Sequence, residues 1–450
     1  MDLEAGKKLL EKKQYKKALS FFLSKLEREN KTIRLYLSLA FVYFQLNQIK
    51  DSIKYYKLAL EIEPKSINII LNLANCNYVL GNFSLAKKFY LKSIILNKND
   101  VRGYYGLYLI GSEYLDEDHI LHLNQIKKFS KNLNQNYLIE FLLSKFAKKN
   151  KDFDRELLHL NNFQNQCFES NKEFNNQGLF YYNEIMSKYY NKINFKNIHY
   201  SNEVLKKITP VFIIGLPRSG STLIESIISV SNNQILSLGE NSIINKAIFD
   251  QVKNYIYENN NKTKILDLTL DINDLTEKIA IRYKDYLIDN NTFLIDKSLE
   301  NFFNIETIIN IFPNAKFINS RRNPKDSAIA IYQSMLPELP WAHSLSNILK
   351  YINDYIEIIN FYEKKYSDKI LSVDLESLTK NQVMYSKKIF EFCKLNWSPD
   401  ILNFYKNKNL VVKTLSNTQL RDKITTYDNE KYKPYEKLIE KFKDQYNWLN

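Results

Sequence analysis

A 34-residue internal repeat is the feature of this sequence that constrains the fold most. Residues 33–66 and 67–100 align without a gap. The matched positions carry small or aromatic residues: Leu39-Ala40 with Leu73-Ala74, Tyr56 with Tyr90, and Ala59 with Ser93. Small residues let two helices cross closely and aromatic residues fill the groove between them, so the repeat predicts stacked helix pairs. One such pair cannot bury its apolar face alone, and the stack must therefore continue into neighbouring helices.

The same pattern extends one period in each direction. It includes Ala5-Gly6, Ala18 and Phe22 before the matched units, Pro64 at the end of the first unit, and Tyr104 and Leu107 after the second. These positions resemble the tetratricopeptide consensus, in which proline ends the second helix. We therefore expect an α-helical tetratricopeptide repeat array over residues 1–110. Residues 111–205 show helical spacing, and we expect them to form a helical continuation or cap and a linker.

Composition limits the compartment and the partners. The chain has 450 residues, which predicts more than one domain, and a formal net charge of +14. That charge suits an anionic ligand, a nucleic acid or an acidic surface, although lysines scattered over solvated helix faces account for most of it. Three cysteines stand far apart, which argues against a cysteine zinc site and for a reducing compartment. No apolar run has membrane-spanning length, so we expect a cytoplasmic protein without stable membrane insertion.

Metal binding is not expected from the histidines. His119, His122 and His159 lie in the helical continuation without partners spaced as metal ligands. Nucleic-acid binding through the net charge has no motif to support it, and salt-dependent retention on DNA would test it. We therefore expect neither a metal site nor a nucleic-acid partner.

A glycine-bounded loop follows a short apolar run after Pro210. The run Val211-Phe212-Ile213-Ile214 is typical of a buried strand, and an apolar helix is expected from Leu223. Between them lies the loop Gly215-Leu216-Pro217-Arg218-Ser219-Gly220-Ser221-Thr222. A strand, a glycine-bounded loop and a helix N-terminus bring backbone N–H groups and the helix dipole together, which favours an anion. Arg218 adds a positive charge and the hydroxyl groups add donors, so the loop predicts a phosphate site.

The loop differs from the ATPase phosphate loop in its cation. It has the glycine spacing of GxxxxGK[ST], but Ser221 stands where the lysine is expected, and Arg218 lies three residues earlier. A nucleotide or sugar kinase remains an alternative that predicts dependence on ATP and magnesium. The missing lysine argues against it and favours a different phosphoanhydride ligand.

The sequence GLPRSGST resembles the 5′-phosphosulfate loop of sulfotransferases, in the arginine-bearing form of the tyrosylprotein enzymes and of bacterial repeat-linked relatives. The resemblance covers residues 210 to about 440 and implies a P-loop-like α/β domain with a mostly parallel sheet, which we expect over residues 206–450. It further implies that the cosubstrate is 3′-phosphoadenosine 5′-phosphosulfate (PAPS), with no metal. The loop residues that would bind it are Pro217, Arg218, Ser219, Gly220, Ser221 and Thr222.

A second arginine motif follows about a hundred residues later. The expected strand 315–320 leads to Arg321-Arg322-Asn323-Pro324, where Asn323 is placed to cap a helix that begins with proline. The motif resembles the 3′-phosphate motif of the family, which implies that Arg322 pairs with the ribose 3′-phosphate. Family members place a serine eight residues after that arginine, and here the position is Ala330. Ser327 or Ser334 would have to replace it.

The resemblance also implies a catalytic lysine and a base. Lys297 lies twenty-five residues before Arg322, a spacing similar to that of the catalytic lysine in the tyrosylprotein enzymes. A lysine there neutralises charge on the bridging oxygen as the S–O bond breaks. Glu240, in a Gly-Glu element, resembles the family's catalytic glutamate and would accept the acceptor's proton. Cytosolic sulfotransferases use histidine, so His343 is the second candidate base.

The last part of the chain completes the expected site. Ser416 and Lys431 resemble the positions of the final nucleotide contacts in the family. Together these residues imply in-line sulfuryl transfer to a hydroxyl acceptor: a protein tyrosine, a glycan or a small molecule. A repeat scaffold with an inactive nucleotide-binding domain is the alternative, favoured by Ala330. The array is expected to bind a peptide or protein, to dock a partner, or to support a homo-oligomer.

Overall fold

The computed structural model describes residues 3–28, 31–198, 202–231, 235–258, 268–284, 286–287, 292–407 and 410–450. The chain divides into two compact units. Unit 1 comprises Met1–Ser170 and Tyr405–Lys423, and unit 2 comprises Asn171–Phe404 and Ile424–Asn450. The chain thus returns to unit 1 near its C-terminus, and the domain boundaries at residues 110 and 205 stay a prediction.

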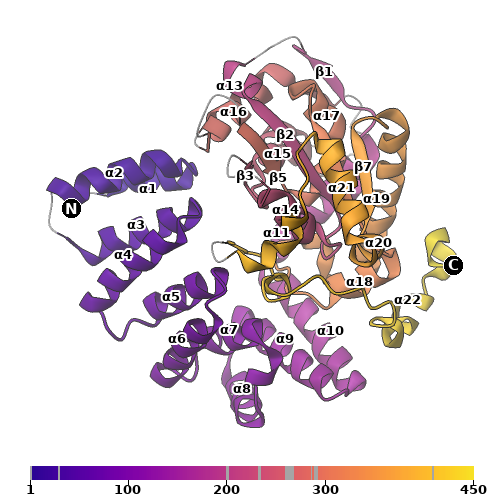
Figure 1. The fold of residues 1–450 in the computed structure, drawn as a ribbon. Coiled ribbons are helices and arrows are strands. Elements are labelled where there is room, and N and C mark those ends of the chain that lie inside the picture. The colour runs from indigo at the N-terminus through magenta and orange to yellow at the C-terminus, as the bar shows by residue number, and fades with distance from the viewer. Residues whose placement is uncertain are drawn as a thin grey trace. The chain divides into compact units, whose positions relative to one another are not determined.

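Unit 1 is helical (Figure 1). Its helices are α1 (Glu4–Glu11), α2 (Tyr15–Arg28), α3 (Ile33–Gln45), α4 (Ile49–Ile62), α5 (Ile67–Val79), α6 (Phe83–Leu96), α7 (Arg102–Ile110), α8 (Glu117–Phe129), α9 (Leu133–Lys149) and α10 (Phe153–Ser170), with the short turn η1 (Ser112–Tyr114). Consecutive helices pack on one another from α1 to α7 and from α8 to α10, and the strongest packing within the repeat joins α3 to α4 and α5 to α6. The helix pairs predicted from the 34-residue period are therefore present.

The positions that define the repeat form the core of this unit. Leu39, Ala40, Leu73 and Ala74 are wholly inaccessible to solvent, and Tyr90 is also buried. Close crossing of the helices requires a small residue where an added Cβ would enter a neighbouring ring. Gly106 on α7 shows this, because a Cβ there would collide with the ring of Tyr90 on α6. The buried aromatic groove is thus built from matched positions of successive units.

The returning segment of unit 1 caps helix ends. Lys413 Nζ donates to the carbonyl of Phe44 at 2.7 Å, near the end of α3. At the end of α5, Asn417 Nδ2 donates to the carbonyl of Tyr78 at 2.5 Å, and an Arg421 guanidinium nitrogen donates to that of Val79 at 2.9 Å. The last carbonyls of a helix have no partner within it, and cations favour that end of the helix dipole. Lys413, Asn417 and Arg421, spaced four residues apart, therefore supply hydrogen-bond donors to carbonyl groups at the ends of α3 and α5.

Unit 2 contains a five-stranded sheet that is entirely parallel among its described strands, in the order β3-β5-β2-β6-β7. The strands are β2 (Ile208–Gly215), β3 (Ile235–Ser237), β5 (Thr292–Asp296), β6 (Lys316–Arg321) and β7 (Ile370–Asp374). A separate two-stranded sheet pairs β1 (Asn194–Lys196) with β4 (Thr269–Asp271). The parallel α/β sheet predicted from the sequence is confirmed.

Helices surround these strands (Figure 1). They are α11 (Lys172–Phe180), the π-helix η2 (Tyr181–Met186), α12 (Ser187–Tyr189), α13 (Glu203–Lys206), α14 (Ser221–Ser229), α15 (Ile243–Glu258), α16 (Ile272–Lys284), η3 (Leu299–Asn304), α17 (Ile305–Ile311), α18 (Pro324–Tyr332), η4 (Pro340–His343), α19 (Leu345–Lys365), α20 (Leu375–Lys380), α21 (Gln382–Cys393) and α22 (Lys437–Glu440). Short 3₁₀ turns complete the described chain at η5 (Pro399–Lys406), η6 (Gln419–Arg421), η7 (Lys433–Tyr435), η8 (Lys443–Gln445) and η9 (Asn447–Leu449). Among the described helices, none is both long and apolar enough to cross a membrane.

The sheet order determines where the site lies. The central strand β2 has β5 on one side and β6 on the other, and β3 lies beyond β5. All these strands run in the same direction, so their carboxyl ends meet at one edge, where open α/β sheets bind ligands. The predicted loop follows β2, Glu240 follows β3, Lys297 follows β5, and Arg322 follows β6. The topology therefore brings four motifs that are distant in sequence to the same edge.

Candidate functional site

The loop of residues 215–222, predicted to bind phosphate and called the phosphate loop below, joins β2 to α14. It contains two glycines in backbone conformations that other residues rarely adopt. Gly215 has φ of 137°, and a Cβ there would collide with the backbone oxygen of Ser320 on the neighbouring strand. Gly220 has φ of 94° and precedes α14, which begins without a side-chain cap. A Cβ on Gly220 would lie 2.6 Å from Leu375 Cδ1. The glycine spacing seen in the sequence is therefore required by close approach and by backbone conformation.

Arg218 lies in the same loop in the left-handed region, with φ of 66°. Its side chain is half-buried, as are Pro217 and Thr222, whereas Ser219 and Ser221 are buried. The Ser219 hydroxyl donates to Ser320 Oγ at 3.1 Å, and the Ser320 hydroxyl donates to the Ser219 carbonyl at 3.0 Å. Ser219 therefore fastens the loop to the end of β6.

Arg322 contacts the loop directly. One terminal guanidinium nitrogen donates to the carbonyl of Arg218 at 3.0 Å. The two arginine motifs, about a hundred residues apart in the chain, thus meet at the carboxyl ends of β2 and β6. Neighbouring Arg321 instead pairs with Asp374 at the end of β7, with Nε 2.9 Å from a carboxylate oxygen. Only Arg322 of the two is bonded to the phosphate loop in the described contacts.

Two tyrosine rings from the C-terminal part of unit 2 contact the guanidinium of Arg322, and the sequence analysis did not predict them. The guanidinium carbon lies 4.8 Å from the ring centre of Tyr427 and 4.7 Å from that of Tyr432, within cation–π range. Tyr427 Oη also accepts from Nε of Arg322 at 3.0 Å and donates its own proton to Asp326 on α18. Burial alone would lower the pKa of Arg322, but Tyr432 and Tyr427 raise it above its usual value. The arginine therefore stays charged among neutral partners.

Lys297 is the buried cation of the site. Its side chain is 1% exposed, and Nζ lies 2.9 Å from Glu240 Oε1 and 3.3 Å from Glu225 Oε2. Nζ also lies 3.4 Å from Thr222 Oγ1, in the phosphate loop. Burial alone would lower the pKa of this lysine, but Glu225 and Glu240 raise it above its usual value. The predicted lysine and the predicted glutamate are thus in contact, beside the start of α14.

The backbone around Glu240 is held by β5. The N–H of Leu238 donates to the Ile295 carbonyl at 2.9 Å, and the N–H of Lys297 donates to the Gly239 carbonyl at 3.0 Å. Asp296, which lies between Ile295 and Lys297 in the sequence, is wholly buried and accepts a hydrogen bond from Tyr283 Oη at 2.9 Å. Burial raises the pKa of its carboxyl group. The Glu240 side chain itself is 57% exposed. A rigid backbone therefore presents an accessible carboxylate.

His343, the second candidate base, lies in η4 and is 4% exposed. Burial lowers its pKa to about 4, and a hydrogen bond with the Pro337 backbone opposes that shift. The imidazole is therefore neutral at physiological pH. Proximity to the buried lysine favours Glu240 over His343.

The remaining residues predicted to bind the nucleotide do not all lie at the edge of the sheet where the four motifs meet. Ser327 is wholly buried and its hydroxyl donates to the Asn323 carbonyl at 3.0 Å, whereas Ser334 donates to the Ala330 carbonyl at 2.7 Å. Each serine is thus bonded to its own helix. Lys431 is exposed, and its Nζ lies 5.5 Å from the ring centre of Tyr432, next to Arg322. Ser416 belongs to unit 1, and its nucleotide contact stays a prediction.

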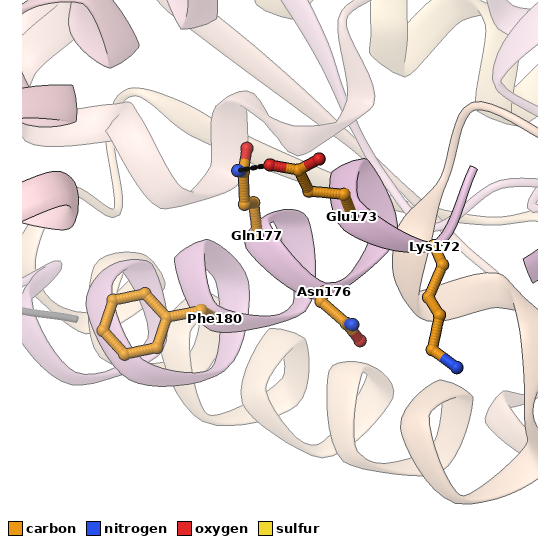
Figure 2. A pocket seen from close by; sticks show the side chains of 5 residues that line it. All are labelled: Lys172, Glu173, Asn176, Gln177 and Phe180. Atoms are coloured by element: carbon orange, nitrogen blue, oxygen red, sulfur yellow. Dashed lines mark hydrogen bonds between the residues drawn. The ribbon is translucent and has the colours of Figure 1, made fainter. Parts of the chain in front are cut away.

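A hollow elsewhere in unit 2 lies along α11 and is separate from the four motifs. Figure 2 shows a hollow along α11, lined by Lys172, Glu173, Asn176, Gln177 and Phe180. Gln177 Nε2 donates there to Glu173 Oε1 at 3.4 Å. Within the described part of the chain, no three His, Cys, Asp or Glu side chains are grouped as metal ligands would be. The hollow shares no residue with the four motifs.

Sequence comparison finds a family model that matches part of unit 2. Residues 210–399 match the family model described as "Sulfotransferase family". An uncharacterized protein of Aquifex aeolicus is 30% identical over 238 residues, which cover 51% of this chain and 31% of that relative. The chain thus matches about a third of the length of this curated relative.

Structure comparison finds solved proteins that are described as sulfotransferases, and their overall similarity to this chain is low. The sulfotransferase domain of a Synechococcus olefin synthase has a TM-score of 0.36 and 17% identity, covering 53% of this chain and 91% of that one. A sulfotransferase of Mycobacterium tuberculosis has a TM-score of 0.30 and 11% identity, covering 68% and 95%. What the comparisons share is therefore a similarity of residues 210–399 to the sulfotransferase family.

Proposed function

We propose that this protein transfers the sulfuryl group of PAPS to a hydroxyl acceptor. The observation that carries the proposal is the contact between the two arginine motifs, in which Arg322 donates to the carbonyl of Arg218. A nucleotide with phosphate groups at both its 3′ and 5′ positions requires two cationic positions close together. The phosphate loop would take the 5′-phosphosulfate, and Arg322, with its planar fork of donors, would take the 3′-phosphate. Lys431 lies on the Arg322 side, next to Tyr432.

The chemistry follows from the contacts of Lys297. In an in-line transfer, the acceptor oxygen forms a bond to sulfur while the bond from sulfur to the bridging oxygen breaks. The electron pair of the broken bond stays on the 5′-phosphate, and the acceptor's proton passes to Glu240. Lys297, beside Thr222 of the phosphate loop, would neutralise charge on the leaving oxygen. The products are a sulfate ester and adenosine 3′,5′-bisphosphate.

The acceptor and the array are part of the same proposal. We propose that the helical array is of the tetratricopeptide type and recruits a protein or peptide that carries the hydroxyl group, with homo-oligomerisation as a second use. Comparing turnover of tyrosine peptides, glycans and small phenols at equal concentration would identify the acceptor class. Size-exclusion chromatography with light scattering would measure the oligomeric state.

A cytoplasmic location is proposed from the cysteines. Cys76, Cys167 and Cys393 are all described, and each is a buried thiol outside any disulfide. Buried thiols suit a reducing compartment. Fractionation of cells that express the tagged protein would test this location.

The experiment that tests the function has two steps. Binding to immobilised adenosine 3′,5′-bisphosphate, challenged with free ATP and magnesium, separates a PAPS enzyme from a kinase. Transfer of ³⁵S from labelled PAPS to a mixture of phenolic and peptide acceptors then separates an enzyme from an inactive scaffold. The proposal predicts both binding and transfer. Binding without transfer to any acceptor would support the scaffold, and preference for ATP with magnesium would support a kinase.

A further inference from the structure

Lys297 has more carboxylate neighbours than the predicted mechanism uses. An ammonium group has three N–H donors. Three acceptors lie within 3.4 Å of Nζ: Glu240 Oε1, Glu225 Oε2 and Thr222 Oγ1. Every donor therefore has an acceptor in the described structure. Glu225 is the member of this set that the sequence analysis did not predict.

The two carboxylates differ in how they are held. Glu225 lies on α14, one helical turn after Thr222, and its side chain is only 14% exposed. Its second oxygen accepts a hydrogen bond from Ser237 Oγ at the end of β3. Glu240 follows the same strand in a loop, and its side chain is 57% exposed. Glu225 is thus fixed by a helix and a strand, whereas Glu240 has the freedom to change partners.

Proton transfer makes the second carboxylate necessary. When Glu240 accepts the acceptor's proton it becomes neutral, and it no longer balances the charge of Lys297. A buried ammonium that loses its only counter-ion is strongly destabilised. We propose that Glu225 is a positioning residue that keeps Lys297 charged and directed at the phosphate loop while Glu240 leaves it to accept the proton. This inference rests on the proposed sulfuryl transfer and assigns Glu225 no contact with substrate.

The charged groups around this lysine favour its protonated form. Glu225 and Glu240 act on Lys297 directly, as described above. Asp296 precedes it on β5 and has a pKa raised by burial. Glu300 of η3 and Glu338, which precedes η4, both have pKa values raised by burial and further by Glu240. Replacing Glu225 with an uncharged isostere removes the largest influence that raises the pKa of Lys297, so that pKa falls.

The sign of the expected effect follows from this fall. Lys297 must be protonated to neutralise the leaving oxygen, so activity is lost as pH rises through its pKa. Glu225→Gln should therefore move the alkaline limb of the kcat profile to lower pH. At neutral pH we expect kcat to fall on the order of tenfold to a hundredfold through misplacement of the lysine. The KM for PAPS should change by less than about threefold, because Arg218 and Arg322 are untouched.

The experiment compares Glu225→Gln with Glu225→Asp and Ser237→Ala in the full-length protein. The aspartate variant keeps the charge and should restore the alkaline limb, and the Ser237 variant removes only the hydrogen bond that holds Glu225. An independent readout is the pH titration of Lys297 itself, followed by NMR of the protein labelled with ε-¹³C lysine. In Glu225→Gln the Lys297 signal should titrate at lower pH than in the wild type.

The outcomes separate the two proposals. If the wild-type protein binds the bisphosphate nucleotide but no form transfers sulfate, the proposed function fails, and the NMR titration still reports whether Glu225 keeps Lys297 protonated. If the wild type turns over and Glu225→Gln loses activity with an unchanged alkaline limb and an unchanged NMR titration, the role assigned to Glu225 is wrong. A downward shift in both profiles, reversed by aspartate, supports it.

Discussion

The half-buried Arg322 and the buried Lys297, both at the edge of the sheet, have opposite surroundings. Arg322 is covered by two tyrosine rings and bonded to a phenol and a backbone carbonyl, all of them neutral. Lys297 lies between two carboxylates. A cation with neutral partners keeps its whole charge for an incoming anion, whereas a cation paired with carboxylates must first lose one of those pairs. For the proposed transfer, we therefore expect Arg322 to provide binding energy and Lys297 to respond to charge that develops during the reaction.

The largest effect is expected on the side that binds the nucleotide. Arg218→Ala should abolish nucleotide binding and turnover together, because Arg218 supplies the positive charge of the phosphate loop. Calorimetric titration with adenosine 3′,5′-bisphosphate measures the first effect, and ³⁵S transfer measures the second. Arg321→Gln is the matched control, since its guanidinium pairs with Asp374 and should leave nucleotide affinity nearly unchanged. Normal affinity in Arg218→Ala would remove the loop from the nucleotide site.

A smaller effect, confined to the chemical step, is expected at the lysine. Lys297→Ala should lower kcat by about 10²–10³-fold, the range seen when one donor to developing charge is removed. Nucleotide affinity should fall much less, because the lysine's charge is already balanced by carboxylates. Steady-state kinetics with varied PAPS gives both quantities. Lys278→Ala is the control, because Lys278 pairs with Asp274 within α16. Equal losses in affinity and kcat would erase the contrast between the two sides.

The base should contribute slightly less. Glu240→Gln should lower kcat on the order of a hundredfold with nucleotide affinity nearly intact, since a positioned base typically contributes 10²–10⁴-fold. The variant also removes one counter-ion of Lys297, so a pH profile of kcat should accompany it. Glu306→Gln, which removes a carboxylate paired with Lys365, is the matched control. Unchanged turnover in Glu240→Gln would direct attention to His343.

The smallest effect is expected from the phenol that holds Arg322. Tyr427→Phe keeps the ring over the guanidinium but removes the acceptor of its Nε hydrogen bond. Hydrogen bonds to charged groups contribute about 1.5–3 kcal/mol, so the KM for PAPS should rise by roughly tenfold while kcat changes little. Tyr182→Phe, which removes a phenol bonded to Glu300, should leave the KM for PAPS unchanged. A loss of kcat alone in Tyr427→Phe would contradict a role in binding.

Local patterns predicted much of the fold. The 34-residue period predicted the helix pairs of α3 to α6, because close crossings demand small residues at fixed spacing. The cap at Asn323 was predicted as well, and its side chain accepts from the Lys325 N–H at 2.9 Å. Each of these features depends on neighbours within a few turns of chain. The return of residues 405–423 to unit 1 depends on contacts between residues that lie more than three hundred positions apart in the sequence. No local sequence pattern predicted it.

The amino-acid sequence was enough to predict an anion-binding loop, from the spacing of Gly215 and Gly220 and the positive charge of Arg218. It also offered Lys297, Glu240 and Arg322 as separate candidates at the ends of short strands. That these groups meet follows from the strand order β3-β5-β2-β6-β7, which is a property of the folded chain. The tertiary structure alone revealed Glu225 and Tyr427 as their partners. The reason is physical: a side chain's pairing depends on distances across the sheet edge, which local spacing does not encode.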